Sequence, residues 1–323
     1  MNKCLGCGIE LQDKDPNKIG YTTDINNKYC LRCFRIKNYN DYKLVDKSNN
    51  DYIKILEEIN KTNDLVILVV DIFNIGHIDI ISKYLKNNIL LVITKKDLLS
   101  GYDKKIEEYF NHYKLNIIDK VIISSKNNYN FDLLYSKINK YKTKSIYVVG
   151  FTNAGKSSMI NKLLYNYTDK NINITTSYLP STTLDTIEID LDEYKLIDTP
   201  GLLDDGNIIN YVDKDTLKKI IPKKEIKPKI FQIKQDQSII VDKILRIDIK
   251  KENDIVFYMS NLEYLRVYKE NDKLTNLEKH VLDVDDNTDI VINGLGFIKI
   301  KKKTTITLYT LKNVLVYKRK SLI

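Results

Sequence analysis

The sequence predicts an α/β protein in three parts: a four-cysteine module over residues 1–40, a mainly parallel α/β domain over 41–222 and a basic, β-rich domain over 223–323. Three observations predict this organisation. All four cysteines lie near the N-terminus, apolar β-branched runs then alternate with helical patterns, and after Pro222 the pattern changes to alternating strands. With 323 residues, the chain exceeds what a single hydrophobic core usually organises.

The cysteines form two CxxC pairs, Cys4 with Cys7 and Cys30 with Cys33. Each pair can fold into a tight knuckle whose sulfur atoms point at one ion, and two knuckles complete the tetrahedral thiolate set that zinc prefers. Four protein ligands leave no position for water, so a zinc ion here would be structural. Two disulfides are the alternative, but nothing in the sequence implies an oxidising compartment.

The central part alternates strands and helices. Strands are predicted over Leu65–Asp71, Ile89–Thr94 and Val121–Ser124, and helices around Asp103–Lys114 and Phe131–Tyr141. Strands separated by helices, with polar loops at their C-terminal ends, predict a mainly parallel sheet that is covered on both faces.

A phosphate-binding loop of the form GxxxxGK[ST] spans Gly150–Ser158, between the apolar run Ser145–Val149 and a helical pattern that starts near Met159. In this context the backbone N–H groups cradle phosphates, Lys156 reaches the β- and γ-phosphates, and Ser157 binds Mg²⁺. The loop residues expected at the nucleotide are Asn153, Ala154, Gly155, Lys156, Ser157 and Ser158.

Two further segments complete the phosphate side of the site. The sequence Asp198-Thr199-Pro200-Gly201 follows an apolar strand, so Asp198 is expected to hold Mg²⁺ through water and the Gly201 N–H to contact the γ-phosphate. The polar loop Pro180–Asp185 supplies a threonine that closes over Mg²⁺, for which Thr183 is preferred and Thr182 stays open. The predicted magnesium residues are therefore Ser157, Thr183 and Asp198.

The guanine-reading motif lies upstream of the phosphate loop, as Thr94-Lys95-Lys96-Asp97. The Asp97 carboxylate accepts hydrogen bonds and suits the N1–H and exocyclic amine of guanine, a pair that adenine lacks. The segment Ser124-Ser125-Lys126 then occupies the place of the loop that backs the base. GTPase motifs are numbered G1 to G5 in their ordinary order along the chain. Here they occur in the order G4 (Thr94–Asp97), G5 (Ser124–Lys126), G1 (Gly150–Ser158), G2 (Pro180–Asp185) and G3 (Asp198–Gly201). This rotated order predicts a circularly permuted P-loop GTPase domain. A small-molecule kinase is a weaker alternative, because Asp97 and Asp198 fit the GTPase set.

This motif order behind a four-cysteine lead resembles the YqeH-type circularly permuted GTPases, a family associated with small ribosomal subunit assembly. The likeness is carried by the cysteine pairs, Val70–Phe73, Gly150–Ser158, Pro180–Asp185 and Asp198–Gly201, and it spans about residues 1–205. Two positions depart from the family's pattern, since Thr94 replaces the usual Asn and Ser125 the usual Ala. The resemblance implies that the C-terminal domain binds RNA.

The charge distribution agrees with that implication. Residues 1–214 carry 29 Lys+Arg against 28 Asp+Glu, and residues 215–323 carry 23 against 15, so +8 of the net +9 lies in the last third. Such asymmetry indicates a polyanionic partner, either nucleic acid or an anionic membrane surface, with a merely solvated face as the alternative. The candidate RNA contacts are Lys299, Lys301, Lys302 and Lys303, with Phe297 and Tyr309 as stacking surfaces, against the alternative of a lysine-protected edge strand.

Together these features predict a slow GTP-hydrolysing switch that binds GTP or GDP and ribosomal RNA or a pre-ribosomal subunit. The alternative is a nucleotide-regulated RNA-binding module with negligible hydrolysis. Lys156, Thr183 and Asn153 are the expected catalytic residues, with Mg²⁺ and structural Zn²⁺ as cofactors. Leu202 stands where many GTPases have a water-orienting Gln, and Asn153 resembles the residue of GTPases that bind K⁺. No apolar run reaches membrane-spanning length and no signal peptide is evident, so a cytoplasmic location, or an organellar one in a eukaryote, is expected.

Overall fold

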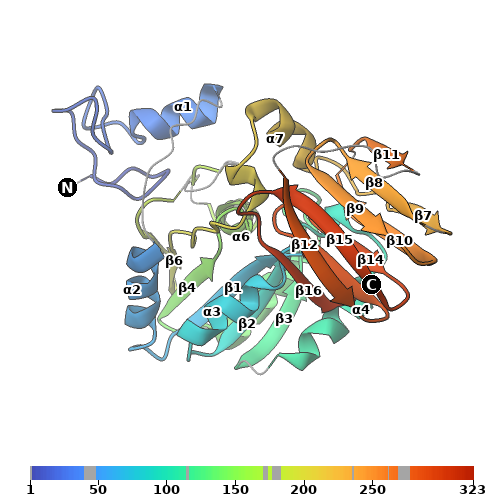
Figure 1. Cartoon of the computed structure of the whole chain (residues 1–323). Coiled ribbons are helices and arrows are strands. Elements are labelled where there is room, and N and C mark those ends of the chain that lie inside the picture. The colour runs from blue at the N-terminus through green and yellow to red at the C-terminus, as the bar shows by residue number, and fades with distance from the viewer. Residues whose placement is uncertain are drawn as a thin grey trace. The chain divides into compact units, whose positions relative to one another are not determined.

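The computed structural model describes residues 2–39, 49–113, 116–169, 174–176, 183–234, 236–260, 262–267 and 277–323 (Figure 1). Contacts between Cα atoms divide the chain into two compact units, Met1–Lys96 with Tyr113–Asp204 and Asp97–His112 with Asp205–Ile323. The four-cysteine module therefore groups with the first unit, and residues 205–222 group with the second. The predicted organisation into three domains, with boundaries after residues 40 and 222, is not tested by this division into two units and stays a prediction.

The first unit is built on a six-stranded sheet with the order β3-β2-β1-β4-β6-β5. Its strands are β1 (Leu65–Asp71), β2 (Ile89–Thr94), β3 (Ile117–Ile122), β4 (Ser145–Gly150), β5 (Ile187–Asp190) and β6 (Lys195–Asp198). Every neighbouring pair is parallel except β5 with β6, which is antiparallel. The predicted mainly parallel sheet is confirmed.

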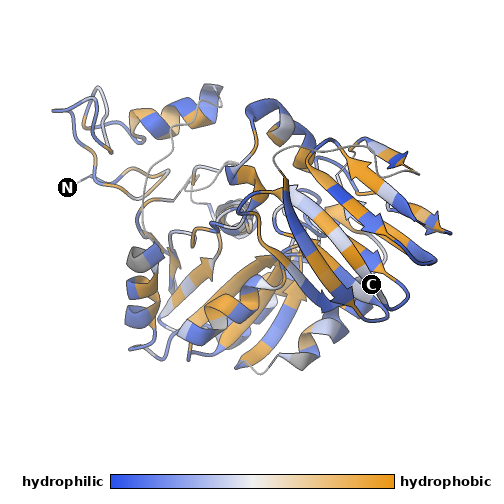
Figure 2. Ribbon diagram, viewed as in Figure 1, coloured by the Kyte–Doolittle hydropathy of each residue, from blue (hydrophilic) through white to orange (hydrophobic). Residues whose placement is uncertain are grey.

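Helices cover this sheet because its central strands are apolar on both faces. The helices of this unit are α1 (Leu31–Tyr39), α2 (Asn49–Ile59), α3 (His77–Ile81), α5 (Phe131–Tyr141) and α6 (Lys156–Tyr167), with the 3₁₀ turn η1 (Ser82–Tyr84). Every residue of β1 and β2 is buried, and Figure 2 shows both strands as almost uniformly hydrophobic. The apolar positions of α5 recur as Phe131, Leu134 and Ile138 and pack into the same core as Met159 and Leu163 of α6.

Strand β3 differs from the sequence prediction of Val121–Ser124, because it starts four residues earlier and ends two residues earlier. It is the edge strand of the sheet and only its last two residues are buried, so its start lacks a continuous apolar run. The edge position accommodates Asp119, which accepts hydrogen bonds from Lys137 and Tyr141 of α5. Burial opposes ionisation of Asp119, but these partners keep the pKa of its carboxyl below the ordinary value.

The second unit is β-rich, as predicted. Its strands form two antiparallel five-stranded sheets with the orders β16-β13-β14-β10-β7 and β11-β8-β9-β15-β12. The strands are β7 (Lys229–Ile233), β8 (Gln237–Val241), β9 (Leu245–Ile249), β10 (Asn253–Met259), β11 (Tyr264–Val267), β12 (Leu277–Val284), β13 (Thr288–Ile292), β14 (Gly296–Ile300), β15 (Thr304–Leu311) and β16 (Val316–Lys320). The helical segments are α4 (Asp103–Tyr109), η3 (Phe110–His112), η4 (Ile208–Asn210) and α7 (Lys214–Ile220), and η2 (Lys96–Leu98) bridges the division.

The segment that follows Asp204 belongs to this second fold. The Leu315 N–H donates to the Gly206 carbonyl at 2.8 Å, and the Ile208 N–H donates to the Asn293 carbonyl at 3.0 Å. Gly294, at φ +80°, lies so close that a Cβ there would stand 1.9 Å from the Asn207 side-chain oxygen. Within the described residues, no helix has the length and apolar character needed to cross a membrane.

Candidate nucleotide and metal sites

The predicted nucleotide motifs of the first unit meet at one edge of the parallel sheet. The strand register pairs Val69 with Gly150, Ile93 with Ile122, and Val148 with Asp198. The carboxyl ends of β1, β2, β3, β4 and β6 therefore lie level, and each is followed by a polar loop. Ligands of open α/β sheets bind outside this edge, at the point where the strand order reverses.

The phosphate loop between β4 and α6 has the backbone that such a loop requires. Asn153 and Gly155 both have positive φ, at 62° and 95°. The Thr94 hydroxyl donates to the Ala154 carbonyl at 2.6 Å, and a Cβ on Gly155 would lie 3.3 Å from that hydroxyl oxygen. Thr94, which replaces the family's usual Asn, therefore holds the phosphate loop from the end of β2, although β1 lies between β2 and β4 in the sheet.

Lys156 begins helix α6 and turns its ammonium group back over the loop. It donates to the Gly150 and Phe151 carbonyls at 3.1 and 3.0 Å. Burial lowers the pKa of Lys156 to about 8, and the negative charge of Asp198 opposes that shift. A buried cation beside the first N–H groups of a 12-residue helix, which include those of Ser157 and Ser158, fits an anionic ligand such as phosphate.

Three oxygen atoms converge next to this lysine. The hydroxyls of Ser157 and Thr183 donate to Asp198 Oδ2 at 3.2 and 3.1 Å, and the two hydroxyl oxygens lie 3.4 Å apart. Asp198 is fully buried, and its Oδ1 has no hydrogen-bond partner within the described part of the chain. A buried carboxylate with an unused oxygen and two adjacent hydroxyls matches the hard oxygen ligands that Mg²⁺ takes, so the residues present fit that ion. Thr182 and the preceding residues 177–181 lie outside the described residues.

The Thr-Lys-Lys-Asp segment leaves β2 in an unusual backbone conformation. Lys95 has φ 63°, and its ammonium group lies 3.6 Å from Asp71 Oδ2 at the end of β1. Burial opposes ionisation of Asp71, but Lys95, the Asn74 amide and His77 together keep the pKa of its carboxyl below the ordinary value. Asp97 follows directly in η2.

The loop that follows β3 is closed on itself. Ser124 and Tyr129 exchange backbone hydrogen bonds at 3.3 and 3.0 Å, and the Asn127 N–H donates to the Ser124 hydroxyl. The Lys96 N–H donates to the Ile123 carbonyl, so this loop stands beside the Thr-Lys-Lys-Asp segment. Ser125 is half-buried and Lys126 is exposed.

Sequence reasoning missed a buried histidine at this edge. His77 opens α3, its ring stacks on the Phe151 ring at 3.9 Å between centroids, and its Nε2 lies 2.8 Å from Asp204 Oδ2. The contact joins the phosphate loop to the segment that follows Gly201, where the Thr152 N–H also donates to the Leu202 carbonyl at 2.9 Å. No local pattern marks His77, because its partners are 74 and 127 residues away in the chain.

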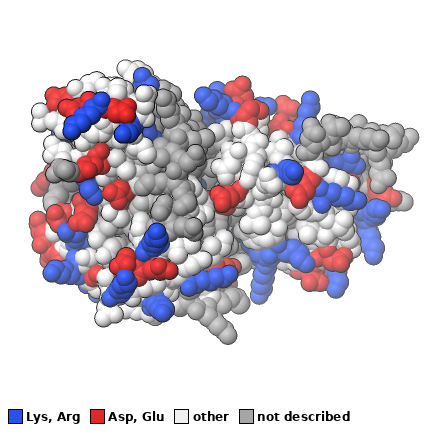
Figure 3. All heavy atoms as spheres, turned by 60° about the vertical axis from the view of Figure 1, so that its left-hand side comes forward, with Lys and Arg blue, Asp and Glu red and all other residues white. Residues whose placement is uncertain are grey.

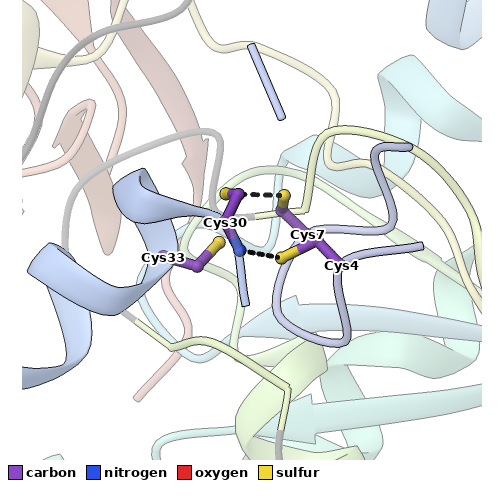
Figure 4. A group of neighbouring side chains, drawn as sticks. All are labelled: Cys4, Cys7, Cys30 and Cys33. Carbon is purple, nitrogen blue, oxygen red and sulfur yellow. Dashed lines mark hydrogen bonds between the residues drawn. The ribbon is translucent and has the colours of Figure 1, made fainter. Parts of the chain in front are cut away.

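The four cysteines converge as predicted, and all four are buried (Figure 4). Their sulfur atoms lie within 4.8 Å of one another. Cys7 Sγ and Cys30 Sγ are 3.9 Å apart, close to the roughly 3.8 Å edge of a tetrahedron with zinc–sulfur bonds of about 2.3 Å. The Cys30 N–H also donates to Cys4 Sγ at 3.2 Å. These residues fit a structural Zn²⁺.

We expect about one tightly held zinc per chain, following the stoichiometry of a four-thiolate site. Elemental analysis of protein purified without added metal measures it, and Cys7→Ser is expected to lower the zinc content sharply because one thiolate is lost. Metal-free protein with oxidised cysteines would contradict this expectation.

The structure contradicts one of the RNA contacts that the sequence suggested in the second unit, the stacking role of Phe297. Phe297 is fully buried between the Tyr258 ring, stacked at 4.7 Å, and the Arg319 guanidinium, so it cannot stack on a base. Lys301, Lys302 and Lys303 each form an ion pair with a nearby carboxylate, and the Lys299 ammonium donates to the C-terminal Ile323 carbonyl. On the face drawn in Figure 3, basic and acidic side chains are interspersed.

A phosphate loop, a buried set of magnesium-type oxygens and guanine motifs in rotated order define a circularly permuted P-loop GTPase. Two family models match, an RsgA GTPase model over residues 56–206 and a 50S ribosome-binding GTPase model over residues 145–294. The rotation explains why each covers a different part of the chain, since one includes the upstream motifs and the other starts at β4.

The relatives identify the family. The chain is 32% identical to YqeH of Bacillus subtilis, with 99% of both chains covered, and it therefore belongs to the YqeH family of GTPases. It is 27% identical to the NO-associated protein 1 of Arabidopsis thaliana, over 71% of this chain and 48% of that protein. The solved structure of YjeQ from Thermotoga maritima is 23% identical, covering 48% of this chain and 51% of that chain at a TM-score of 0.30.

Proposed function

We propose that this protein is a GTP-binding and GTP-hydrolysing switch that acts in assembly of the small ribosomal subunit by binding ribosomal RNA or a pre-ribosomal particle. One observation carries the proposal. Residues 205–222, which follow the Asp198–Gly201 motif, are built into the β-rich second unit, so only Leu202, Leu203 and Asp204 separate that motif from it. A change at the γ-phosphate therefore has a short covalent route to the second unit.

In this proposal different residues bind the base, the phosphates and the magnesium ion of the nucleotide. Asp97 reads the guanine base, with the Ser124–Lys126 loop behind it, and Lys156 neutralises the β- and γ-phosphates. Ser157, Thr183 and Asp198 hold Mg²⁺, which supplies positive charge to the phosphates when bound. The Gly201 N–H faces the γ-phosphate, and a Cβ at Gly201 would lie 2.8 Å from the Thr152 backbone nitrogen, so any side chain there would force the backbone to shift.

The second unit supplies the RNA-binding surface. The +8 net charge of residues 215–323, which make up most of this unit, supports a polyanionic partner. Edge strand β7 and the residues on either side of it carry exposed lysines at 223, 224, 227, 229 and 234. On β7 itself the Phe231 ring lies under the Arg266 guanidinium, 5.2 Å from its centroid. This basic edge replaces the Lys299–Lys303 segment as the candidate RNA contact.

The ribosomal partner is supported by membership of the YqeH family and by the match to the 50S ribosome-binding GTPase model. Proteins of that model bind the 50S subunit, whereas we propose the small subunit for this chain, so both subunits are tested. We expect a protein without stable membrane association, located in the cytoplasm or, in a eukaryote, in an organelle.

Single-turnover hydrolysis of GTP, with and without each purified ribosomal subunit, tests the proposed function. We expect slow hydrolysis alone and faster hydrolysis with the small subunit. Undetectable hydrolysis under every condition, with GTP bound, would favour the alternative of a nucleotide-regulated RNA-binding module.

We further expect K⁺ to accelerate hydrolysis. Leu202 is apolar and buried, so it cannot orient the attacking water, and another group must stabilise the transition state. Asn153 lies in the phosphate loop and has a left-handed backbone. A monovalent cation bound beside it would supply positive charge to the transition state, much as an arginine finger does. We expect turnover roughly 10-fold higher in KCl than in matched NaCl, and loss of that difference in Asn153→Ala. Equal rates in both salts would refute the K⁺ effect.

A further inference from the structure

The segment that carries Thr183 is hydrogen-bonded to the first cysteine knuckle, residues 4–8. The Leu184 and Asp185 N–H groups both donate to the Cys7 carbonyl, at 2.9 and 3.0 Å. Upstream in the same loop region, the Thr175 N–H donates to the Gly6 carbonyl at 3.2 Å. Two successive carbonyls of the knuckle thus bind the described segments 174–176 and 183–186, and the second segment begins with the magnesium threonine.

The glycines of the knuckle make this close approach possible. A Cβ on Gly6 would lie 2.1 Å from the Thr175 hydroxyl oxygen. Gly8 has φ +79°, and a Cβ there would lie 2.5 Å from the Asp185 carbonyl oxygen. Any other residue at either position would push the loop away from the knuckle, so the sequence Cys-x-Gly-Cys-Gly serves contact with this loop as well as the turn itself.

A side chain of the loop also completes the interior of the cysteine module. Leu184 is fully buried and belongs to the same apolar cluster as Leu11 and the four cysteines. Its neighbour in the chain is Thr183, whose hydroxyl donates to Asp198 Oδ2 at 3.1 Å. A single peptide bond therefore joins a residue in the core of the metal module to a residue of the magnesium site.

We propose that the first cysteine knuckle anchors segment 183–186, so that the position of Thr183 at Mg²⁺ and the integrity of the metal-bound module stabilise each other. Leu184, Gly6 and Gly8 act as positioning residues for Thr183. The inference rests on the proposed magnesium role of Thr183. Coupling between two binding sites is reciprocal in free energy. If the metal-bound module increases the affinity for GTP, bound GTP must increase the affinity for the metal by the same factor.

The wild-type protein allows a direct test of that reciprocity. Zinc transfer to a chromogenic chelator is measured in the presence of saturating Mg²⁺ with either GDP or a non-hydrolysable GTP analogue. We expect zinc to be about 5- to 100-fold harder to remove with the GTP analogue, the usual range for coupled sites. Equal zinc loss with both nucleotides bound overturns the inference, whereas failure to bind the GTP analogue at all would count against the proposed function.

A matched pair of variants separates loop anchoring from general stability. Leu184→Ala and Leu11→Ala remove the same side-chain volume from the same cluster, but only Leu184 belongs to the loop. Leu184→Ala is expected to weaken binding of the GTP analogue relative to GDP roughly 10-fold and to abolish the nucleotide effect on zinc loss. Leu11→Ala is expected to loosen zinc while leaving the ratio of the two nucleotide affinities unchanged. The same ratio in both variants would contradict the assignment of Leu184.

Discussion

Asp97→Asn is expected to weaken GTP binding by about 30- to 1,000-fold, because loss of a charge-assisted contact costs on the order of 2–4 kcal/mol. The substitution exchanges an acceptor for an amide that also donates, which suits the C2 carbonyl of xanthine in place of the guanine amine. Affinity for xanthosine triphosphate should therefore rise while that for GTP falls. Competition against a fluorescent nucleotide measures both affinities.

Asp192→Asn is a suitable control for this experiment. Asp192 is exposed in the turn before β6, at the end of the strand opposite to the predicted nucleotide loops, so it should leave both affinities unchanged. Unaltered GTP affinity in Asp97→Asn would show that the guanine motif does not lie upstream of the phosphate loop and that the rotated order is wrong.

Asp198→Asn is expected to have opposite effects on the stability of the free protein and on its response to Mg²⁺. Burial raises the pKa of Asp198 to about 6, although Lys156, Thr183 and Ser157 oppose that rise. Ionisation at pH 7 therefore costs the folded protein up to about 3 kcal/mol relative to an ordinary aspartate. The neutral amide removes that cost, and we expect nucleotide-free Asp198→Asn to be about 1–2 kcal/mol more stable at pH 7.5.

The sign of the pH dependence follows from the same shift. A carboxyl whose pKa is higher in the folded than in the unfolded state binds its proton better when folded. The cost of ionising Asp198 is therefore relieved as the pH falls from about 6 towards the unfolded value of 3.8. The stability difference between variant and wild type should shrink at pH 5. Thermal unfolding at pH 5 and 7.5, with and without Mg²⁺ and nucleotide, measures these effects. A less stable variant that keeps its full Mg²⁺-dependent stabilisation would refute the role given to Asp198.

The parts of the fold that could be predicted are those determined by local sequence. Val66–Val70 is a continuous apolar run and became a fully buried strand, and Phe131–Tyr141 has the spacing of its observed helix. The cysteine pairs and the phosphate loop were equally local signals. Strand β3 was shifted because an edge strand needs no continuous apolar run.

The features that could not be predicted depend on contacts between distant residues. Nothing near Leu184 marks it as part of a cysteine cluster about 150 residues upstream, and His77 is recognisable only by its partners. Lys301 and Asp254 are likewise 47 residues apart, so charge alone suggested an RNA contact where the structure has an ion pair. Phe297 was placed on the surface by pattern, whereas the pairing of β14 between β10 and β13 buries it.

We expect the bound nucleotide to control attachment of this protein to a ribosomal particle. Co-sedimentation of the full chain with purified small and large ribosomal subunits, in GDP or in a non-hydrolysable GTP analogue, tests it directly. We expect the protein to sediment with the small subunit in the GTP analogue and largely to stay in the supernatant in GDP. Equal sedimentation in the two nucleotides, or none with either subunit although the GTP analogue is bound, would contradict it.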